Sequence, residues 1–391
     1  MIYSKTGKIW SNDYEFNKVG TLDKVNLSKD NVVYYHHPYD NLFHKVSFVE
    51  AVDPENFEHI RRNPTVTLVH ENTSEAIDAR FAEEVYQVIS KHNLNPGQVK
   101  VVTADENHKN FLKSYLENKK IFGTKITVHN VLLSKVDEVS IENNNTVKKF
   151  SSLSRNYKDW RLFLYEELFR HNLLKDFTYS FHNIWPYTNV PQVFTVEQMV
   201  EDLNKLGVNN LSKEFLTWLR NCPYDIPEDI ISRRFVKWLN KITGSGVKDK
   251  WSTVTYDAIC SADFHLMVET HFDQRSFTGQ INFDRSFGPS SITEKAYKAI
   301  ACSRPFIVFA TPYFLEDLRN LGYKTFSPFI NESYDRETDN HKRLNMIVAE
   351  VKRICDLPQE EYTELVARCR TIAKYNSEHF KKHKDQHKND A

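Results

Sequence analysis

The sequence predicts an α/β protein built from parallel sheets that are covered by helices. From about residue 31 onward, short apolar runs alternate with segments of helical periodicity, which is typical of β-α-β units. The chain has 391 residues, more than one hydrophobic core usually organises, so two domains are expected. We place the first domain at residues 1–147 and the second at 148–357, followed by a C-terminal helix and polar tail over 358–391.

In the first domain, apolar runs rich in β-branched residues predict strands, and amphipathic spacing predicts the helices between them. The predicted strands cover residues 32–35, 65–69, 99–103 and 125–128, and the predicted helices cover residues 77–89 and 108–118. Residues 142–147 contain three consecutive asparagines and are the best candidate for a linker between the domains.

The second domain opens with an apolar segment that is followed by a polar loop and a helix, an order that often carries a ligand in open α/β sheets. Its predicted elements are a strand from Phe150, a helix over 158–171, a helical insertion over 195–250, and strands over 252–260 and 263–269. The last fifty residues are helical in pattern, and the segment from His379 onward is too polar to be expected to pack.

Composition restricts the function classes. Lys plus Arg equals Asp plus Glu, at 52 each, so no overall charge draws the protein to nucleic acid or membranes. The N-terminal segment lacks the apolar core of a signal peptide, and no apolar run reaches the roughly 18 residues of a membrane span. The five cysteines are scattered and are expected to be reduced. We therefore expect a cytoplasmic protein without membrane insertion.

Several familiar motifs are absent from the sequence. There is no Asp-x-Asp pair, no paired zinc-ligand spacing, no G-x-G-x-x-G and no P-loop. Neither a bound metal nor a dinucleotide cofactor is therefore expected.

The segment from Ser290 to Phe326 carries the clearest functional signal. Hydroxyl side chains, with Thr293 the last of them, precede a predicted helix whose first turn contains Glu294 and Lys295. Backbone N–H groups and the helix dipole attract phosphate at such a position, and a lysine adds a full charge. An apolar run at residues 305–309 follows and predicts a buried parallel strand.

This Thr-Glu-Lys helix start with its buried strand resembles the donor-binding motif of GT-B glycosyltransferases. It is most similar to the α1,3-fucosyltransferase family and its bacterial and phage relatives, over residues 150–180 and 264–335. The resemblance implies two Rossmann-like domains that face each other across a cleft, with helices at the C-terminus. It also implies transfer of a sugar from a nucleotide-sugar donor to a hydroxyl acceptor, without a metal or a further cofactor.

The same resemblance implies roles for individual residues. Arg155 and Lys295 would bind the diphosphate, and Glu294 would accept hydrogen bonds from the ribose hydroxyls. Glu269 matches a glutamate of the family pattern, but Thr270 stands where the family has asparagine, which puts the carry-over for residue 270 in doubt.

Three further cationic residues are donor-site candidates from their positions. Lys158 and Arg161 lie at the first turn of the predicted helix after Phe150, about one helical turn apart, and could equally form a solvated face. Arg275 lies in a loop that could fold over the donor.

The catalytic base is expected from the first domain. Glu71 and, second, Asp105 each stand just past a predicted strand, although either could instead be a helix-capping acid. The pair His36-His37 is a third option.

The acceptor is left open by the sequence. A composition rich in Asn, Lys, Tyr and Phe and poor in Gly suggests a phage protein, for which a hydroxymethylated pyrimidine in DNA is a plausible acceptor. A basic rim could come from Lys109, Lys113, Lys119, Lys120 and Arg61-Arg62. The alternatives are a glycan acceptor, as in surface polysaccharide synthesis, and a non-catalytic nucleotide- or nucleic-acid-binding protein of the same fold.

Overall fold

A computed structural model describes most of the chain, and its residues group into two compact units. The described residues are 2–3, 32–36, 54–72, 79–128, 130, 133, 136, 146–154, 156–185, 192–226, 250–273, 289–290 and 292–390. Unit 1 takes in the residues up to Val136, and unit 2 contains residues 137–276 and 295–381. Two short segments, 277–294 and 382–391, group with unit 1.

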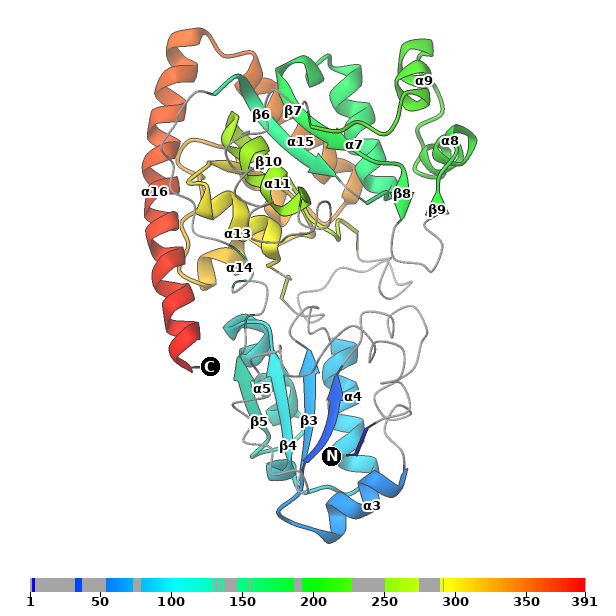
Figure 1. Cartoon of the computed structure of the whole chain (residues 1–391), viewed down its shortest axis with the longest axis vertical. Helices are drawn as coiled ribbons and strands as arrows, with labels where there is room; N and C mark the ends of the chain where they lie inside the picture. The colour runs from blue at the N-terminus through cyan, green and yellow to red at the C-terminus, as the bar shows by residue number, and fades with distance from the viewer. Residues whose placement is uncertain are drawn as a thin grey trace. The chain divides into compact units, whose positions relative to one another are not determined.

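Unit 1 contains a parallel sheet in which the strands follow one another in sequence order, β1-β2-β3-β4-β5 (Figure 1). The strands are β1 (Ile2–Tyr3), β2 (Val32–His36), β3 (Thr67–Asn72), β4 (Val99–Thr103) and β5 (Lys125–Val128). The helices are α3 (Pro54–Arg62), α4 (Ala79–Lys91) and α5 (Glu106–Asn118). The order never reverses among these described strands.

Helix α4 and strand β4 form because their apolar residues pack into one hydrophobic core in unit 1. Val85, Val88 and Ile89 form the buried face of α4, and they share one hydrophobic cluster with Val99 and Val101 of β4. The apolar, β-branched run that predicted β4 and the helical spacing that predicted α4 therefore contribute to the same core.

Unit 2 contains a second parallel sheet, with the strand order β11-β10-β6-β7 (Figure 1). The strands are β6 (Lys148–Ser154), β7 (Phe177–Phe181), β10 (Ala262–Val268) and β11 (Phe306–Phe309). The chain moves from β6 to β7 on one side and returns to place β10 on the other side of β6. The order thus reverses between β6 and β10.

Helices flank this sheet. They are α7 (Asp159–Arg170), α8 (Val196–Lys205), α9 (Lys213–Arg220), α11 (Lys250–Cys260), α13 (Glu294–Ala301), α14 (Phe314–Asn320), α15 (Asn340–Cys355) and α16 (Gln359–Asp390). Short elements complete the unit: the hairpin strands β8 (Ile184–Trp185) and β9 (Gln192–Val193) and the 3-10 turn η6 (Ser333–Arg336). Helix α7 is buried along most of its length because α8, α9 and α15 all contact it. No described helix is long and apolar enough to cross a membrane.

The fold class is the predicted one, a mixed α/β protein with parallel sheets. Strands β4 and β5 have the predicted bounds, and the other predicted strands of unit 1 and the helices α4, α5 and α7 agree within a few residues. The predicted linker lies mostly outside the described residues, as do residues 227–249 of the proposed insertion. The domain boundaries therefore stay predictions.

One predicted strand is wrong. Residues 252–260 were expected to be extended because the segment is rich in β-branched and aromatic residues, but they belong to helix α11. The helix contacts β6 and β10 and buries Tyr256, Ala258 and Ile259. Tertiary packing outweighs the local strand propensity here.

The chain beyond His379 also differs from expectation, because α16 continues through it. Phe380 is fully buried, and the His379 ring packs edge-on against Tyr323 at 4.6 Å between centroids. The Nε2 of His379 donates to the carbonyl of Leu321 at 2.9 Å. Gly322 has a φ of +87°, and a Cβ there would lie 2.8 Å from the imidazole, so only glycine fits this contact.

Candidate functional site

The reversal of strand order in unit 2 creates a natural ligand position at the carboxyl ends of β6 and β10. In open parallel sheets, the loops that leave two neighbouring strands at such a reversal diverge to opposite faces and leave a crevice between them. The loop after β6 leads into α7, and the loop after β10 begins with Glu269. Candidate donor residues from both loops therefore come together at one place.

Glu269 lies at the end of β10 and is only 3% exposed. Its backbone N–H donates to the carbonyl of Phe309 at 2.9 Å, which extends the pairing of β10 with β11 by one residue. Its Oε2 lies 3.5 Å from the Nζ of Lys295, and the same Nζ donates to the hydroxyl of Thr270 at 3.0 Å. The lysine at the start of α13 is thereby connected to the end of the central strand.

Lys158 and Arg161 stand at the start of α7. Lys158 is the N-cap residue, with extended backbone and no side-chain cap. Arg161 is 4% exposed and donates to the carbonyls of Asn156 and Glu269, at 2.8 and 2.9 Å. The guanidinium therefore bridges the two loops that flank the reversal. The prediction that Arg161 could be part of a solvated helix face is wrong.

The electrostatics of the site reflect several cations placed close together. Burial, and then the charge of Arg161, lowers the pKa of Lys158 to about 8. Burial lowers the pKa of His271 to about 2, with further contributions from Lys158, Lys295 and Arg161. His271 is therefore a neutral imidazole. Lys158, Arg161 and Lys295 all act on it, at the place where the strand order reverses between β6 and β10, which we call the switch point.

Two contacts hold the loop after β10 in place. The ring of Phe272 stacks on Phe309 at 3.8 Å between centroids, and the guanidinium carbon of Arg343 lies 4.1 Å from the centroid of the same Phe272 ring. Arg343 is 1% exposed and donates to the carbonyls of Phe272 and Ala310. Because Arg343 lies on α15, a helix far along the chain holds the loop that begins with Glu269 in position.

A third contact joins the same loop to α7. The indole Nε1 of Trp160 donates to Asp273 at 2.7 Å. The loops on the two sides of the reversal are therefore connected at two points, through Arg161 and through Trp160. A site built in this way is positioned before any ligand arrives.

The arrangement is suited to binding an anion with more than one negative charge. Lys158, Arg161 and Lys295 supply positive charge, and α7 and α13 begin beside them, where the helix dipole favours an anion. Within the described part of the chain, no group of three His, Cys, Asp or Glu residues could hold a metal ion.

The other predicted donor residues fall into two groups. Arg155 and Arg275 lie outside the described residues. Thr293 immediately precedes α13, and Glu294 is its first residue, which agrees with the predicted helix start. Their roles in binding stay predictions.

The two candidates for the catalytic base lie in unit 1. Glu71 lies within β3, one residue before its end, and its side chain is outside the described part of the structure. Asp105 caps α5: it is 1% exposed, accepts from the backbone of His108 at 3.0 Å, and lies 2.9 Å from the imidazole Nδ1 of His108. The capping interpretation of Asp105 is thus confirmed, while a catalytic role stays a prediction.

Sequence reasoning missed His271, Asp273 and Arg343. His271 and Asp273 follow Glu269 closely, and a polar loop after a predicted central strand was the signal that could have identified them. Arg343 gave no signal, because it lies 71 residues beyond its partner Phe272 and sits in an ordinary amphipathic helix.

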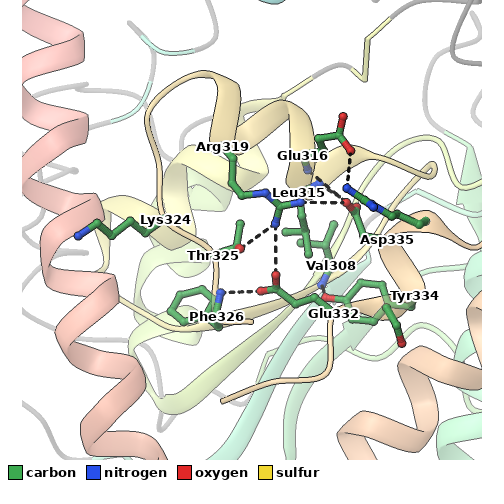
Figure 2. Close-up of polar contacts among 12 residues, drawn as sticks. Val308, Leu315, Glu316, Arg319, Lys324, Thr325, Phe326, Glu332, Tyr334 and Asp335 are labelled. Carbon is green, nitrogen blue, oxygen red and sulfur yellow. Dashed lines mark hydrogen bonds and ion pairs between the residues drawn. The ribbon is translucent and has the colours of Figure 1, made fainter. Parts of the chain in front are cut away.

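Tyr334 and Asp335 belong to a network of polar contacts that supports the structure around α14 (Figure 2). The Asp335 carboxylate accepts from the backbone N–H groups of Leu315 and Glu316, at 2.8 and 3.2 Å. Tyr313, the N-cap of α14, has a φ of 66° and provides no side-chain cap. Asp335 therefore supplies the missing N-cap of α14 from another segment of the chain.

Comparison with known proteins gives structural similarity only. No protein-family model matches the chain, and no curated protein matches its sequence. The chain is similar to a solved structure described as a GtfA/B complex, at 12% identity and a TM-score of 0.38, over 85% of this chain and 54% of that one. It is also similar to a UDP-forming α,α-trehalose-phosphate synthase from Burkholderia xenovorans, at 8% identity and a TM-score of 0.40, over 94% and 75% of the two chains. The chain thus spans about half the length of the first of these structures.

Proposed function

We propose that the chain is a glycosyltransferase whose nucleotide-sugar donor binds through its diphosphate at the carboxyl ends of β6 and β10. The observation that carries the proposal is the convergence of Lys158, Arg161 and Lys295 on this switch point. Departure of a nucleoside diphosphate develops negative charge, and buried cations stabilise that charge without a metal ion.

The cationic residues of the site are proposed to have different roles in binding the donor. Arg161 is committed to two carbonyls, so it contributes charge from behind the loop. Lys295 is 28% exposed at its side chain and Lys158 stands at a helix start, so these two are the residues that contact the diphosphate. Glu269 orients Lys295, and Glu294 is proposed as the ribose ligand on the resemblance alone.

The acceptor is proposed to be a saccharide rather than DNA. The cationic side chains that could form a DNA-binding rim are mostly paired with neighbouring carboxylates. The pairs are Arg61 and Arg62 with Glu58, Lys109 with Glu106, Lys113 with Glu117 and Lys119 with Glu83. Such pairs reduce the counterion release that drives DNA binding. Retention on hydroxymethylated duplex at low salt would favour DNA, and no retention would favour the saccharide.

The experiment that tests the enzymatic proposal is incubation with UDP-, GDP- and dTDP-sugars, followed by measurement of nucleotide release. Release with one donor class supports a glycosyltransferase. Binding of a nucleoside diphosphate without release under any acceptor would instead support the non-catalytic nucleotide-binding alternative. Absence of both binding and release would overturn the proposal.

A further inference from the structure

Three connecting segments of the chain lie together at the edge of the unit 1 sheet where its parallel strands begin. Helices α3, α4 and α5 end at this edge, because each of them leads directly into the next parallel strand. The connecting segments are residues 63–66, 92–98 and 119–124. We call the surface formed by these segments, with the helix ends and strand starts that adjoin them, the amino edge.

Two contacts hold the three segments together. The side-chain amide of Gln98 is buried and reaches the end of α3 and the segment after it. There it donates to the carbonyls of Ile60, Asn63 and Val66, at 2.9, 3.0 and 3.1 Å. A Cβ atom at Gly97 would lie 4.0 Å from the carbonyl oxygen of Gly123, so the third segment lies against the second. Side chains from all three segments therefore share one surface.

The amino edge carries more cations than carboxylates. Three exposed lysines at this edge form no ion pair with a carboxylate in the part of the chain that the structure describes: Lys91, Lys120 and Lys125. At the end of α3, Arg61 and Arg62 share the single carboxylate of Glu58. The surface is therefore positively charged, although the whole chain has no net charge.

Two lysines of this surface also face each other across neighbouring strands. Lys100 of β4 stands directly opposite Lys125 of β5 in the strand register. Burial lowers the pKa of Lys100, and the charge of Lys125 lowers it further. Like charges that stand directly opposite each other in a sheet are destabilising, and an anion bound beside them would reduce that cost.

Phe122 lies at the amino edge among these cations. It is 65% exposed, more than any other large hydrophobic residue that the structure describes, and it lies between Lys120 and Lys125 in the sequence. Gly123, beside it, has a φ of +90°, and no atom lies within 4 Å of a Cβ placed there. The aromatic ring is thus on an open loop, where transfer out of water would be favourable.

We propose that the amino edge docks the protein on an anionic lipid surface, with Phe122 buried at the level of the headgroups and the lysines beside lipid phosphates and carboxylates. Apolar burial and attraction to anionic lipids together give stable binding where either alone is marginal. A nucleic-acid duplex offers anions but no apolar layer, so a lipid surface fits both features of the amino edge better. Single-stranded nucleic acid, whose bases can stack on an aromatic ring, is the alternative that the test addresses.

Sedimentation of the full-length protein with lipid vesicles tests the proposal. Vesicles of phosphatidylcholine with about 30% phosphatidylserine should bind the protein at about 0.1 M salt, and binding should fall at about 1 M salt, because salt screens exposed charges. Vesicles of phosphatidylcholine alone should not bind it. No binding to the anionic vesicles, or equal binding to the neutral ones, would overturn the proposal. The measurement needs no nucleotide, so its outcome is independent of the proposed donor site.

Two variants separate the apolar contribution from the electrostatic one. The Phe122→Ser variant should bind the anionic vesicles about tenfold more weakly, because the apolar burial of the ring is lost. The Lys120→Gln/Lys125→Gln double variant should bind about twentyfold more weakly, since each lysine near an anionic surface contributes about fivefold. Unchanged binding in both variants would place any lipid contact elsewhere and overturn the proposal.

Matched controls change the same kinds of side chain away from the amino edge. Val193 of unit 2 is 59% exposed, so Val193→Ser is the control for Phe122→Ser. Lys109→Gln/Lys113→Gln removes the same charge from α5, where each lysine pairs with a carboxylate. Both controls should bind vesicles as the wild type does, and a loss equal to that of the test variants would overturn the proposal. Binding of a single-stranded oligonucleotide without binding to anionic vesicles would assign the amino edge to nucleic acid instead.

Discussion

The ammonium group of Lys295 lies 3.5 Å from the carboxylate of Glu269, which connects the first turn of α13 to the end of the central strand β10. Glu269 is almost fully buried, whereas the side chain of Lys295 is 28% exposed. The carboxylate therefore holds the lysine in position and leaves part of its charge available to a ligand. This relationship makes Lys295 the first residue to test.

Replacement of Lys295 by methionine should weaken the binding of a nucleoside diphosphate by about tenfold to a hundredfold, because hydrogen bonds to charged groups contribute about 1.5–3 kcal/mol. Isothermal titration calorimetry with UDP, GDP and dTDP measures the change. Lys109→Met is the matched control, since Lys109 is similarly exposed and pairs with one carboxylate, Glu106. Unchanged affinity in the Lys295 variant would mean that the lysine is structural.

Nucleotide affinity should fall as the pH rises from 7 to 9.5. The pKa of Lys158 is lowered to about 8, so its ammonium is charged below that pH and loses its proton above it. A diphosphate binds the charged form more tightly. In the Lys158→Arg variant the side chain stays charged throughout, so its affinity should be nearly constant over the same range. Parallel pH profiles for the two proteins would argue against a contact between Lys158 and the ligand.

The stability of unit 2 should depend on pH through Glu332. Burial raises the pKa of Glu332 to about 7, although it also accepts from the backbone of Phe326 and lies near Arg319 (Figure 2). A raised carboxyl pKa gives stability that is fully present below the unfolded value of 4.5 and is lost as the pH passes about 7.

The Glu332→Gln variant removes that titration and should therefore gain stability relative to the wild type as the pH rises from 4.5 to 8. The gain is at most about 3.5 kcal/mol, since the pKa rises from 4.5 to about 7 and each pKa unit corresponds to about 1.4 kcal/mol. Thermal unfolding at several pH values measures it, and Glu316→Gln, in the same network but more exposed, is the control. A constant difference between Glu332→Gln and the wild type across this range would refute the assignment.

Local sequence predicted the strands of both sheets better than it predicted the site. β4 and β5 were located without error because short apolar or β-branched runs bounded by turn residues have few alternatives. The placement of β10 beside β6 depends on long-range packing, so the switch point itself was not predictable from any one segment. For residues 252–260, local sequence predicted a strand, whereas the folded chain forms helix α11.

The same limit applies to the residues of the site. Lys295 and Glu294 were identified because a helix start with a lysine is visible in a few consecutive residues. The burial of Arg161 and the neutrality of His271 follow only from the two loops lying together. Arg343 contributes from α15, and its effect on the site becomes apparent only in the folded chain.

Arg343 gives the last prediction, because it separates positioning of the loop from direct contact with the ligand. Besides the carbonyls of Phe272 and Ala310, it donates to the carbonyl of Glu337 and to the side chain of Asn340. A lysine has one ammonium and cannot reach four acceptors in different directions. The Arg343→Lys variant should therefore leave buried carbonyls unpaired and lose about 2–4 kcal/mol of stability, measured by urea unfolding.

The same variant should also release the loop that carries Glu269, so hydrogen exchange of residues 269–273 should accelerate and nucleotide affinity should fall. The Arg353→Lys variant is the control, because Arg353 lies on the same helix but is more exposed and mainly pairs with Glu350. If Arg343→Lys lost stability while exchange in the loop and nucleotide affinity stayed as in the wild type, Arg343 would act on the fold of α15 alone and not on the position of Glu269.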